Sequence, residues 1–148
     1  MAATEITTAG RQLVIFGLNG EPYALPIEQV QEIIRYTAPR EVSSNTAWIE
    51  GVISLRGKII PVCNLAHRLG INHERDDHAK IVIVETPNGT AGVIVDEVDE
   101  VVTLKIGELD DAPGSTDDAI QGIVKLDDKL VVLLDPAAIF AGLDIGIA

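Results

Sequence analysis

Short apolar runs, each about the length of a β-strand, alternate with turn residues along most of the chain. The clearest are two pairs of runs, at residues 12–18 and 23–27 and at residues 80–86 and 91–97. An Asn-Gly dipeptide lies between the runs of each pair, and both residues tolerate the positive φ of a tight hairpin turn. The pattern therefore predicts two β-hairpins of similar design.

The same series of short sequence segments, called phrases below, occurs twice in the chain. The phrase IEQVQEII (27–34) follows the first hairpin and VDEVDEVV (95–102) follows the second, a spacing of 68 residues (95 minus 27). Two further apolar hairpins, each with a short helical phrase at its end, occupy residues 51–70 and 122–140, a spacing of 71 residues (122 minus 51). A nearly constant spacing over matched phrases indicates an internal duplication.

The duplication predicts the organisation of the chain. We expect one domain over residues 12–140, made of two superimposable halves, about 12–70 and 80–140, related by a pseudo-twofold axis, after a flexible tail at residues 1–11. The phrase after the first hairpin of each half fits a helical turn or a strand, and we interpret it as one short turn passing into a third strand. Each half then has about five short strands, which is too little to bury a core alone. We therefore predict a mostly β fold of two five-stranded SH3-like β-barrel subdomains with a shared hydrophobic core, plus short helices.

Each half also contains the signals of a short helix at its end. Asn64 precedes the phrase LAHRLG and Asp135 precedes Pro136, and both side chains suit the capping of free backbone amides. Proline is favourable at the first helical position, and Gly70 is placed to end the first helix. These signals are structural, and we assign them no chemistry.

The composition limits the classes of partner. Hydrophobic residues make up 47% of the chain but aromatic residues only 3%, so the core is expected to be aliphatic. The 23 acidic residues outnumber the 11 basic ones and give a formal charge of −12, which repels nucleic acid and anionic lipid. The single cysteine, Cys63, fits a small buried side chain in a reducing cytoplasm. No apolar run reaches the length of a membrane span, so we expect a cytoplasmic protein without direct membrane insertion.

The sequence offers no constellation for catalysis, cofactor binding or metal binding. It contains no phosphate-binding glycine loop, and His67, His73 and His78 lack the spacing of a metal site. The Gly-, Ser- and Asp-rich loop at residues 107–122 is expected to be a solvated, flexible segment rather than a calcium site. These observations favour a binding module over an enzyme. A hydrolase that uses the acidic loop is the rival from another class.

Four blocks of the sequence together resemble the CheW family of bacterial chemotaxis coupling proteins. The blocks are QLVIFGLNGEPYALPIEQVQEII, WIEGVISLRGKIIPVCNLAHRLG, KIVIVETPNGTAGVIVDEVDEVV and IQGIVKLDDKLVVLLDPAAIF, and they span about residues 12–140. The central motif of the family reads NLRG…IPVxDL, where this chain has SLRGKIIPVCNL, with Ser54 and Asn64 at the two departures. The resemblance implies a non-catalytic adaptor without cofactors. It also implies two partners, the cytoplasmic tip of methyl-accepting chemotaxis receptors and the regulatory domain of a CheA-type histidine kinase.

The resemblance also implies which residues bind each partner. The receptor-facing candidates are Val30, Glu32, Arg56, Gly92 and Val98, and the kinase-facing candidates are Ile27, Tyr36 and Gly51. The groove between the barrels is expected to accept an amphipathic receptor helix.

The repeat gives a second way to sort residues. Positions that keep their type in both halves are expected to belong to the fold, and these are Val30/Val98, Glu32/Glu100, Ile33/Val101 and Leu55/Leu126. The hairpin turns diverge, with Arg56-Gly57 in one half and Asp127-Asp128 in the other. Gly57 suits positive φ, whereas Arg56 has no expected role in the fold and is the best candidate for partner contact.

Two alternatives within the same fold remain open at this point. The chain also fits the regulatory domain of a CheA-type kinase, although its 148 residues contain neither an ATP-binding domain nor a phospho-accepting histidine domain. It fits equally an adaptor of a related, non-flagellar chemosensory pathway.

Overall fold

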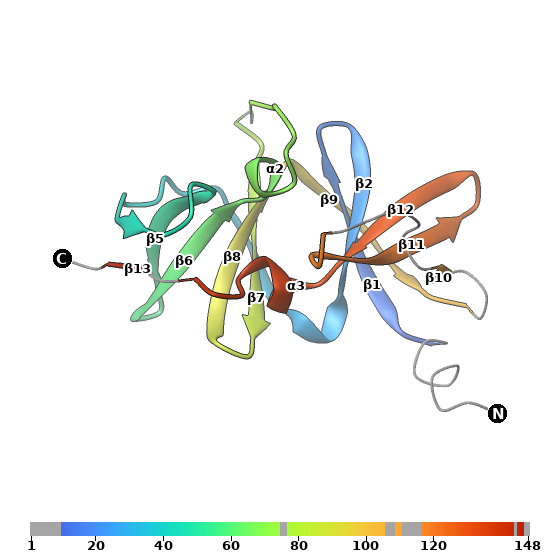
Figure 1. Cartoon of the computed structure of the whole chain (residues 1–148). Helices are drawn as coiled ribbons and strands as arrows, with labels where there is room; N and C mark the ends of the chain where they lie inside the picture. The colour runs from blue at the N-terminus through green and yellow to red at the C-terminus, as the bar shows by residue number, and fades with distance from the viewer. Residues whose placement is uncertain (1–9, 75–76, 106–108, 111–116, 144, 147–148) are drawn as a thin grey trace.

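Nearly all strands of the protein lie in two curved sheets, side by side in the computed structural model (Figure 1). The structure describes residues 10–74, 77–105, 109–110, 117–143 and 145–146. The mostly β fold is therefore confirmed. The six-stranded sheet has the order β10-β11-β12-β2-β1-β9, and the five-stranded sheet has the order β3-β7-β8-β6-β5. Their strands are β1 (Gln12–Leu18), β2 (Glu21–Pro26), β3 (Val30–Arg35), β5 (Ile49–Leu55), β6 (Lys58–Asn64), β7 (Lys80–Thr86), β8 (Gly89–Val95), β9 (Glu97–Thr103), β10 (Leu109–Asp110), β11 (Ile120–Leu126) and β12 (Lys129–Leu134).

Each sheet takes strands from both halves of the repeat. Strand β2 of the first half pairs in parallel with β12 of the second, and β6 of the first half pairs in parallel with β8 of the second. The expectation that each half builds its own barrel is therefore wrong, because the N-terminal hairpin of each half completes the sheet of the other. The two strand orders correspond when each strand is replaced by its repeat equivalent, which is the arrangement that a pseudo-twofold axis requires. Superposition of residues 12–70 on 80–140 remains a prediction.

The sheets resemble open SH3-like barrels, and their strand numbers differ from the expected five each. The two-residue strand β10 adds a sixth strand to one sheet. Strand β4 (Ser43–Ser44) lies outside both sheets and forms a small ribbon with β13 (Ile145–Gly146). In the five-stranded sheet the matching place has an isolated bridge, in which Val52 of β5 exchanges backbone hydrogen bonds of 2.8 and 2.9 Å with Arg40, in the segment after β3.

The predictions for the first Asn-Gly turn and for both helix caps are confirmed, whereas the second turn is displaced by one residue, because Thr86 pairs with Gly89 and the turn consists of Pro87 and Asn88. Asn19 and Gly20 both have positive φ in the β1–β2 turn. Residues 27–29 form the short helical turn η1 (Ile27–Gln29), which leads directly into β3. Helix α2 (Leu65–Arg68) is capped by the Asn64 side chain, which accepts a hydrogen bond from the His67 amide at 3.1 Å. Helix α3 (Pro136–Ile139) is capped by Asp135 in the same way, through the amide of Ala137.

The largest core cluster lies between the sheets and contains side chains of both, as a shared core requires. Phe16 and Leu25 of the six-stranded sheet pack there with Val82 and Val93 of the five-stranded sheet. Burial raises the pKa of the Cys63 thiol in this core, so the thiol stays protonated and is not a reactive nucleophile. Half of the loop expected to be flexible, residues 107–108 and 111–116, lies outside the described residues, as does most of the 1–11 tail.

Candidate partner-binding surfaces

The Arg56-Gly57 turn joins β5 and β6 at one corner of the five-stranded sheet. Arg56 has φ 51° and Gly57 has φ 81°. The left-handed region suits glycine, asparagine and aspartate, and it is unfavourable for arginine. The matching turn of the other half follows this preference, since Asp127 has φ 53°. The predicted role of Gly57 is thus supported, and the arginine occupies a position that the turn itself does not favour.

The Arg56 side chain spans the two edge strands of the five-stranded sheet. Its Nη1 donates a hydrogen bond to the carboxylate of Glu32 on β3. Arg56, for which the sequence indicated no role in the fold, therefore does contact it, because the curvature of the sheet brings the β5–β6 turn next to β3. The Arg56 side chain is nevertheless 72% exposed and that of Glu32 is 27% exposed. An exposed ion pair stabilises a fold by about 1 kcal/mol at most, so the guanidinium remains accessible to a partner.

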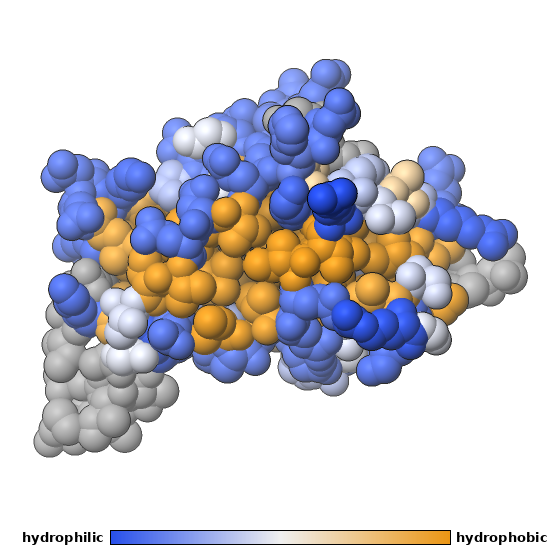
Figure 2. Space-filling view, turned by 180° about the vertical axis from the view of Figure 1, so that it is seen from behind, coloured by the Kyte–Doolittle hydropathy of each residue, from blue (hydrophilic) through white to orange (hydrophobic). Residues whose placement is uncertain are grey.

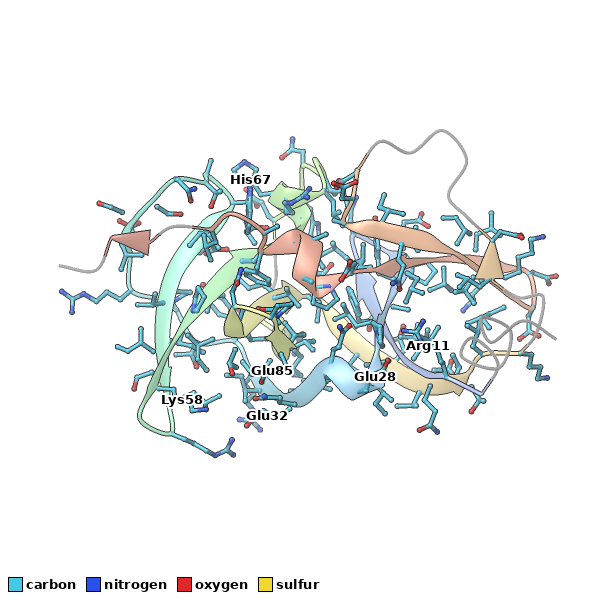
Figure 3. The ribbon with its side chains drawn as sticks, turned by 60° about the horizontal axis from the view of Figure 1, so that its bottom comes forward. Arg11, Glu28, Glu32, Lys58, His67 and Glu85 are labelled. Carbon is cyan, nitrogen blue, oxygen red and sulfur yellow. The ribbon has the colours of Figure 1, made fainter. Side chains whose placement is uncertain are left out.

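Glu32 belongs to a row of polar groups along this end of the five-stranded sheet (Figure 3). Gln31 on β3 donates a hydrogen bond to Glu85 on β7, and Lys58 begins β6 beside the Arg56-Gly57 turn. Figure 3 shows Glu32, Glu85 and Lys58 at the same end of the sheet. In the six-stranded sheet the equivalents of Glu32 and Arg56 are Glu100 and Asp127, two acids that line one open cavity of about 380 Å³. The two ends thus differ in charge although the strands correspond.

Three further candidates lie on or beside β3. Val30 is half-buried against the main core, and its equivalent Val98 on β9 is placed in the same way. A partly buried valine at a rim fits both a fold role and a contact role. Ile27 lies in η1 just before β3, and Tyr36 lies just after it, packed against a smaller core cluster. Val30, a receptor candidate, therefore lies on β3 between the kinase candidates Ile27 and Tyr36, which flank this strand.

The two glycine candidates are buried within the five-stranded sheet. A Cβ on Gly92 would lie 2.8 Å from Cγ2 of Ile81. A Cβ on Gly51 would lie 2.0 Å from the carbonyl oxygen of Arg40, and Gly51 has φ 151°. The absence of a side chain thus lets Ile81 approach the backbone of Gly92 and lets the Arg40 backbone approach that of Gly51. The structure thus gives both glycines a packing role within the sheet.

Among the residues that the structure describes, four large apolar side chains are exposed, and they occupy two pairs of equivalent positions in the repeat. Ile33 and Val101 are 41% and 50% exposed, and Ile59 and Leu130 are 57% and 64% exposed. Ile33 and Val101, which the repeat assigned to the fold, are therefore strand residues whose side chains are exposed. Figure 2 shows apolar side chains in a band across one face of the molecule, bordered by polar groups. The sequence contains a signal for this exposure, which is the alternation along β3: Ile34 faces the core and Ile33 does not.

Side-chain contacts of the α2 region connect the two sheets. Arg68 of α2 makes two hydrogen bonds, of 3.0 and 3.1 Å, to the carboxylate of Asp117, which precedes β11. The guanidinium of Arg68 also lies 5.8 Å from the ring centroid of Trp48. A second contact joins His73 to Asp96, whose carboxylate also accepts the amide of Asn19 in the β1–β2 turn. Side chains of the α2 region thus hold the two sheets together.

We expect Asp117→Asn to lower the free energy of unfolding by about 1–2 kcal/mol at neutral pH, because it removes a charge-assisted bidentate contact. The hydrogen bonds from Arg68 hold the pKa of the Asp117 carboxyl below its usual value. A lowered pKa in the folded state stabilises the protein above the ordinary value of 3.8, and this stability is lost as the pH falls below it. The difference from the parent, measured by urea unfolding, is therefore expected to shrink between about pH 5 and pH 3.

The matched control is Asp110→Asn. Asp110 pairs with Lys125 at 2.8 Å, but both side chains are more than half exposed. We expect a change below about 0.5 kcal/mol. A pH-independent difference for Asp117→Asn would show that the lost contact is steric rather than ionic.

The described residues contain no group of three or more His, Cys, Asp or Glu side chains that is arranged to hold a metal ion. Among the same residues, no helix has the length and apolar character of a membrane span. Both findings concern the described part of the chain alone.

Comparisons with known proteins identify relatives of this architecture. The family description "CheW-like domain" matches residues 12–144. The chain is 35% identical over 140 residues to "Chemotaxis protein CheW" of Bacillus subtilis, covering 91% of this chain and 89% of that protein. It is 29% identical over 126 residues to "Chemotaxis protein CheW" of Thermotoga maritima, covering 84% and 83%. The crystal structure of the scaffolding protein TtCheW from Thermoanaerobacter tengcongensis matches with a TM-score of 0.83 at 34% identity, over 89% of this chain and 93% of that one.

Proposed function

The chain belongs to the CheW family of chemotaxis coupling proteins, and we propose that it couples the cytoplasmic tip of transmembrane chemoreceptors to the regulatory domain of a CheA-type histidine kinase. The protein is thus an adaptor of chemotaxis signalling. We place it in the cytoplasm, recruited to receptor arrays through its partners, and we propose that it binds without catalysing a reaction.

The observation that carries the choice of partners is the placement of Arg56. An exposed guanidinium stands in a turn that favours other residues, beside the partly exposed carboxylate of Glu32. Arginine forms directed hydrogen bonds to carboxylates and to the carbonyls at helix ends, both of which a helical receptor tip presents. We assign receptor contact to Glu32, Arg56, Val30 and Val98, with Gly92 shaping the sheet beneath them.

The kinase contact is assigned to the other candidates on the same sheet. Ile27 and Tyr36 flank β3 and are half-buried, so each presents part of its side chain to a partner. Gly51 supports this region through the close approach of β5 to the backbone of Arg40. Because the kinase domain has a related fold, strands with matching curvature are suited to pack end to end.

The test is direct binding of the purified chain to receptor-tip and kinase regulatory fragments from the same organism. We expect both to bind at once, with affinities in the micromolar range that is usual for transient signalling contacts. ATP should neither raise the melting temperature nor be hydrolysed, since an adaptor has no nucleotide site.

The same experiment separates the alternatives. Binding of the kinase fragment without any receptor fragment would favour a regulatory domain of a kinase. Binding only to receptors of another chemosensory system would favour a non-flagellar pathway. Hydrolysis that survives repurification would contradict the adaptor assignment altogether.

A further inference from the structure

Two positive charges face each other at the end of the β3–β7 ladder. Arg35 is the last residue of β3 and lies directly opposite Lys80, the first residue of β7. Residues that are directly opposite in an antiparallel pair point to the same face of the sheet, and like charges placed there destabilise the pairing. The arrangement therefore opposes folding to a small degree and requires another explanation.

In the part of the chain that the structure describes, no carboxylate forms an ion pair with either cation, although Asp77 lines the same small cavity as both. Elsewhere Arg11 pairs with Glu28, and Arg56, Arg68 and Lys125 also have acidic partners. Within the described ranges, neither Arg35 nor Lys80 forms an ion pair. The Lys80 ammonium donates only to the backbone oxygen of His78, at 3.3 Å. Two unneutralised cations side by side are unexpected in a chain with 23 acidic and 11 basic residues.

The repeat shows that the strand pairing does not need these charges. The equivalent ladder position in the six-stranded sheet is occupied by Gln12 opposite Thr103, which are neutral polar residues. The next residue differs as well, since Leu104 is fully buried whereas its equivalent Tyr36 is half-buried. The same backbone geometry thus carries opposed neutral residues at this end of one sheet and opposed cations at the matching, basic end of the other.

The basic end opens into a shallow cavity of about 360 Å³, lined by Arg35, Tyr36, Asp77, His78, Ala79 and Lys80. Adjacent guanidinium and ammonium groups suit carboxylates, which accept several hydrogen bonds from each. We infer that this cavity is a docking site for an acidic segment of a protein partner, with Arg35 and Lys80 as its charge-recognising residues. The inference rests on the proposed function only in that the segment belongs to a protein that the adaptor couples.

A protein segment fits this site better than a free anion does. The cavity is open and Arg35 is exposed, so a small anion gains only a screened interaction with solvated cations. A segment adds apolar and aromatic contact with Tyr36, which excludes water from the ion pairs and strengthens them. The two charges then contribute mainly to specificity and to the rate of association.

The repeat provides the test variant, Arg35→Thr/Lys80→Gln, which transplants the residues found at the equivalent positions. Its affinity for the receptor-tip and kinase regulatory fragments is measured by calorimetry at about 50 mM and 300 mM salt. We expect one partner to bind about three- to tenfold more weakly at low salt, with a smaller difference at high salt, while the other partner is unaffected. The melting temperature should equal or exceed that of the parent, because the opposed charges are gone.

The control Lys125→Gln/Lys129→Gln removes two positive charges from the six-stranded sheet and should leave both affinities unchanged. Equal weakening by control and variant would overturn the inference, because net charge alone would explain it. Unchanged affinity of the variant for both partners would also overturn it. Competition by about 10 mM inorganic phosphate that abolishes the difference at constant ionic strength would identify a small-anion site instead.

Failure of the proposed function is a different result, in which neither fragment binds the parent protein. A deca-glutamate peptide then serves as the probe, and its binding is detected through the backbone amide chemical shifts of the protein. Shifts centred on Arg35, Tyr36 and Lys80 that vanish in the double variant would support the site. Shifts spread over all basic residues, or none, would overturn it.

Discussion

Arg56→Ala is expected to weaken binding to receptor-tip fragments about tenfold or more while the protein folds and melts like the parent. A partner-facing charge with hydrogen bonds contributes about 1–3 kcal/mol to binding, and tenfold corresponds to about 1.4 kcal/mol. The stability effect is small because the ion pair with Glu32 is exposed and alanine meets the same backbone restriction as arginine. Affinity by calorimetry and melting by circular dichroism measure the two quantities separately.

Three companion variants identify the source of the effect. Arg56→Lys should recover part of the affinity, because it keeps the charge and loses the planar fork. Arg56→Asn should lose affinity and gain slightly in stability, since asparagine is well suited to the left-handed turn. Asp127→Ala, in the matching turn, should leave receptor affinity unchanged. If Arg56→Ala instead melts several degrees lower and keeps its affinity, the arginine serves the fold through Glu32 and not the partner.

Gly51→Ala is expected to lower the free energy of unfolding by about 3 kcal/mol or more, measured by urea titration. The added Cβ would lie 2.0 Å from the carbonyl oxygen of Arg40 and 2.6 Å from its carbonyl carbon. Both are backbone atoms of the residue that hydrogen bonds twice with Val52, so the clash is relieved only by breaking this bridge. The residue must also hold φ 151°, which side chains rarely adopt.

The control for this variant is Gly57→Ala. Gly57 also has positive φ, but nothing lies within 4 Å of its added Cβ, so only the backbone penalty of about 1–2 kcal/mol applies. The difference between the two variants is the steric contribution. A Gly51→Ala protein that melts like the parent but no longer binds the kinase fragment would make Gly51 a contact residue, contrary to its buried position.

The features that the sequence predicted well are those with a local cause. The Asn19-Gly20 turn, the Asn64 and Asp135 caps and the turn before β3 each depend on a few neighbouring residues, and the structure has all of them. The duplication was visible because matched phrases keep their spacing. These signals need no information about which strands meet.

The features that could not be predicted from the sequence depend on the pairing of distant strands. A repeat shows that two hairpins are alike. It does not show whether each hairpin pairs with strands of its own half or of the other half, so the exchange of β1–β2 and β7–β8 was not visible. The contact between Arg56 and Glu32 depends on the curvature that brings two sheet edges together. The cations Arg35 and Lys80 are 45 residues apart (80 minus 35), and only the register of β3 with β7 makes them neighbours.

The exchange of hairpins also sets an order of events during synthesis on the ribosome. All strands of the five-stranded sheet lie within residues 30–95, so this sheet is complete before β11 and β12 have been translated. The β1–β2 hairpin is made first, and its partner strands are translated about 100 residues later. At the usual rate of elongation this is a delay of about 5–20 s. During this interval Phe16 and Leu25 already have a place to pack, because they share the largest core cluster with Val82 and Val93 of the finished sheet. We therefore expect the newly made chain to dock its earliest apolar hairpin on the first sheet to form, which limits its exposure to aggregation.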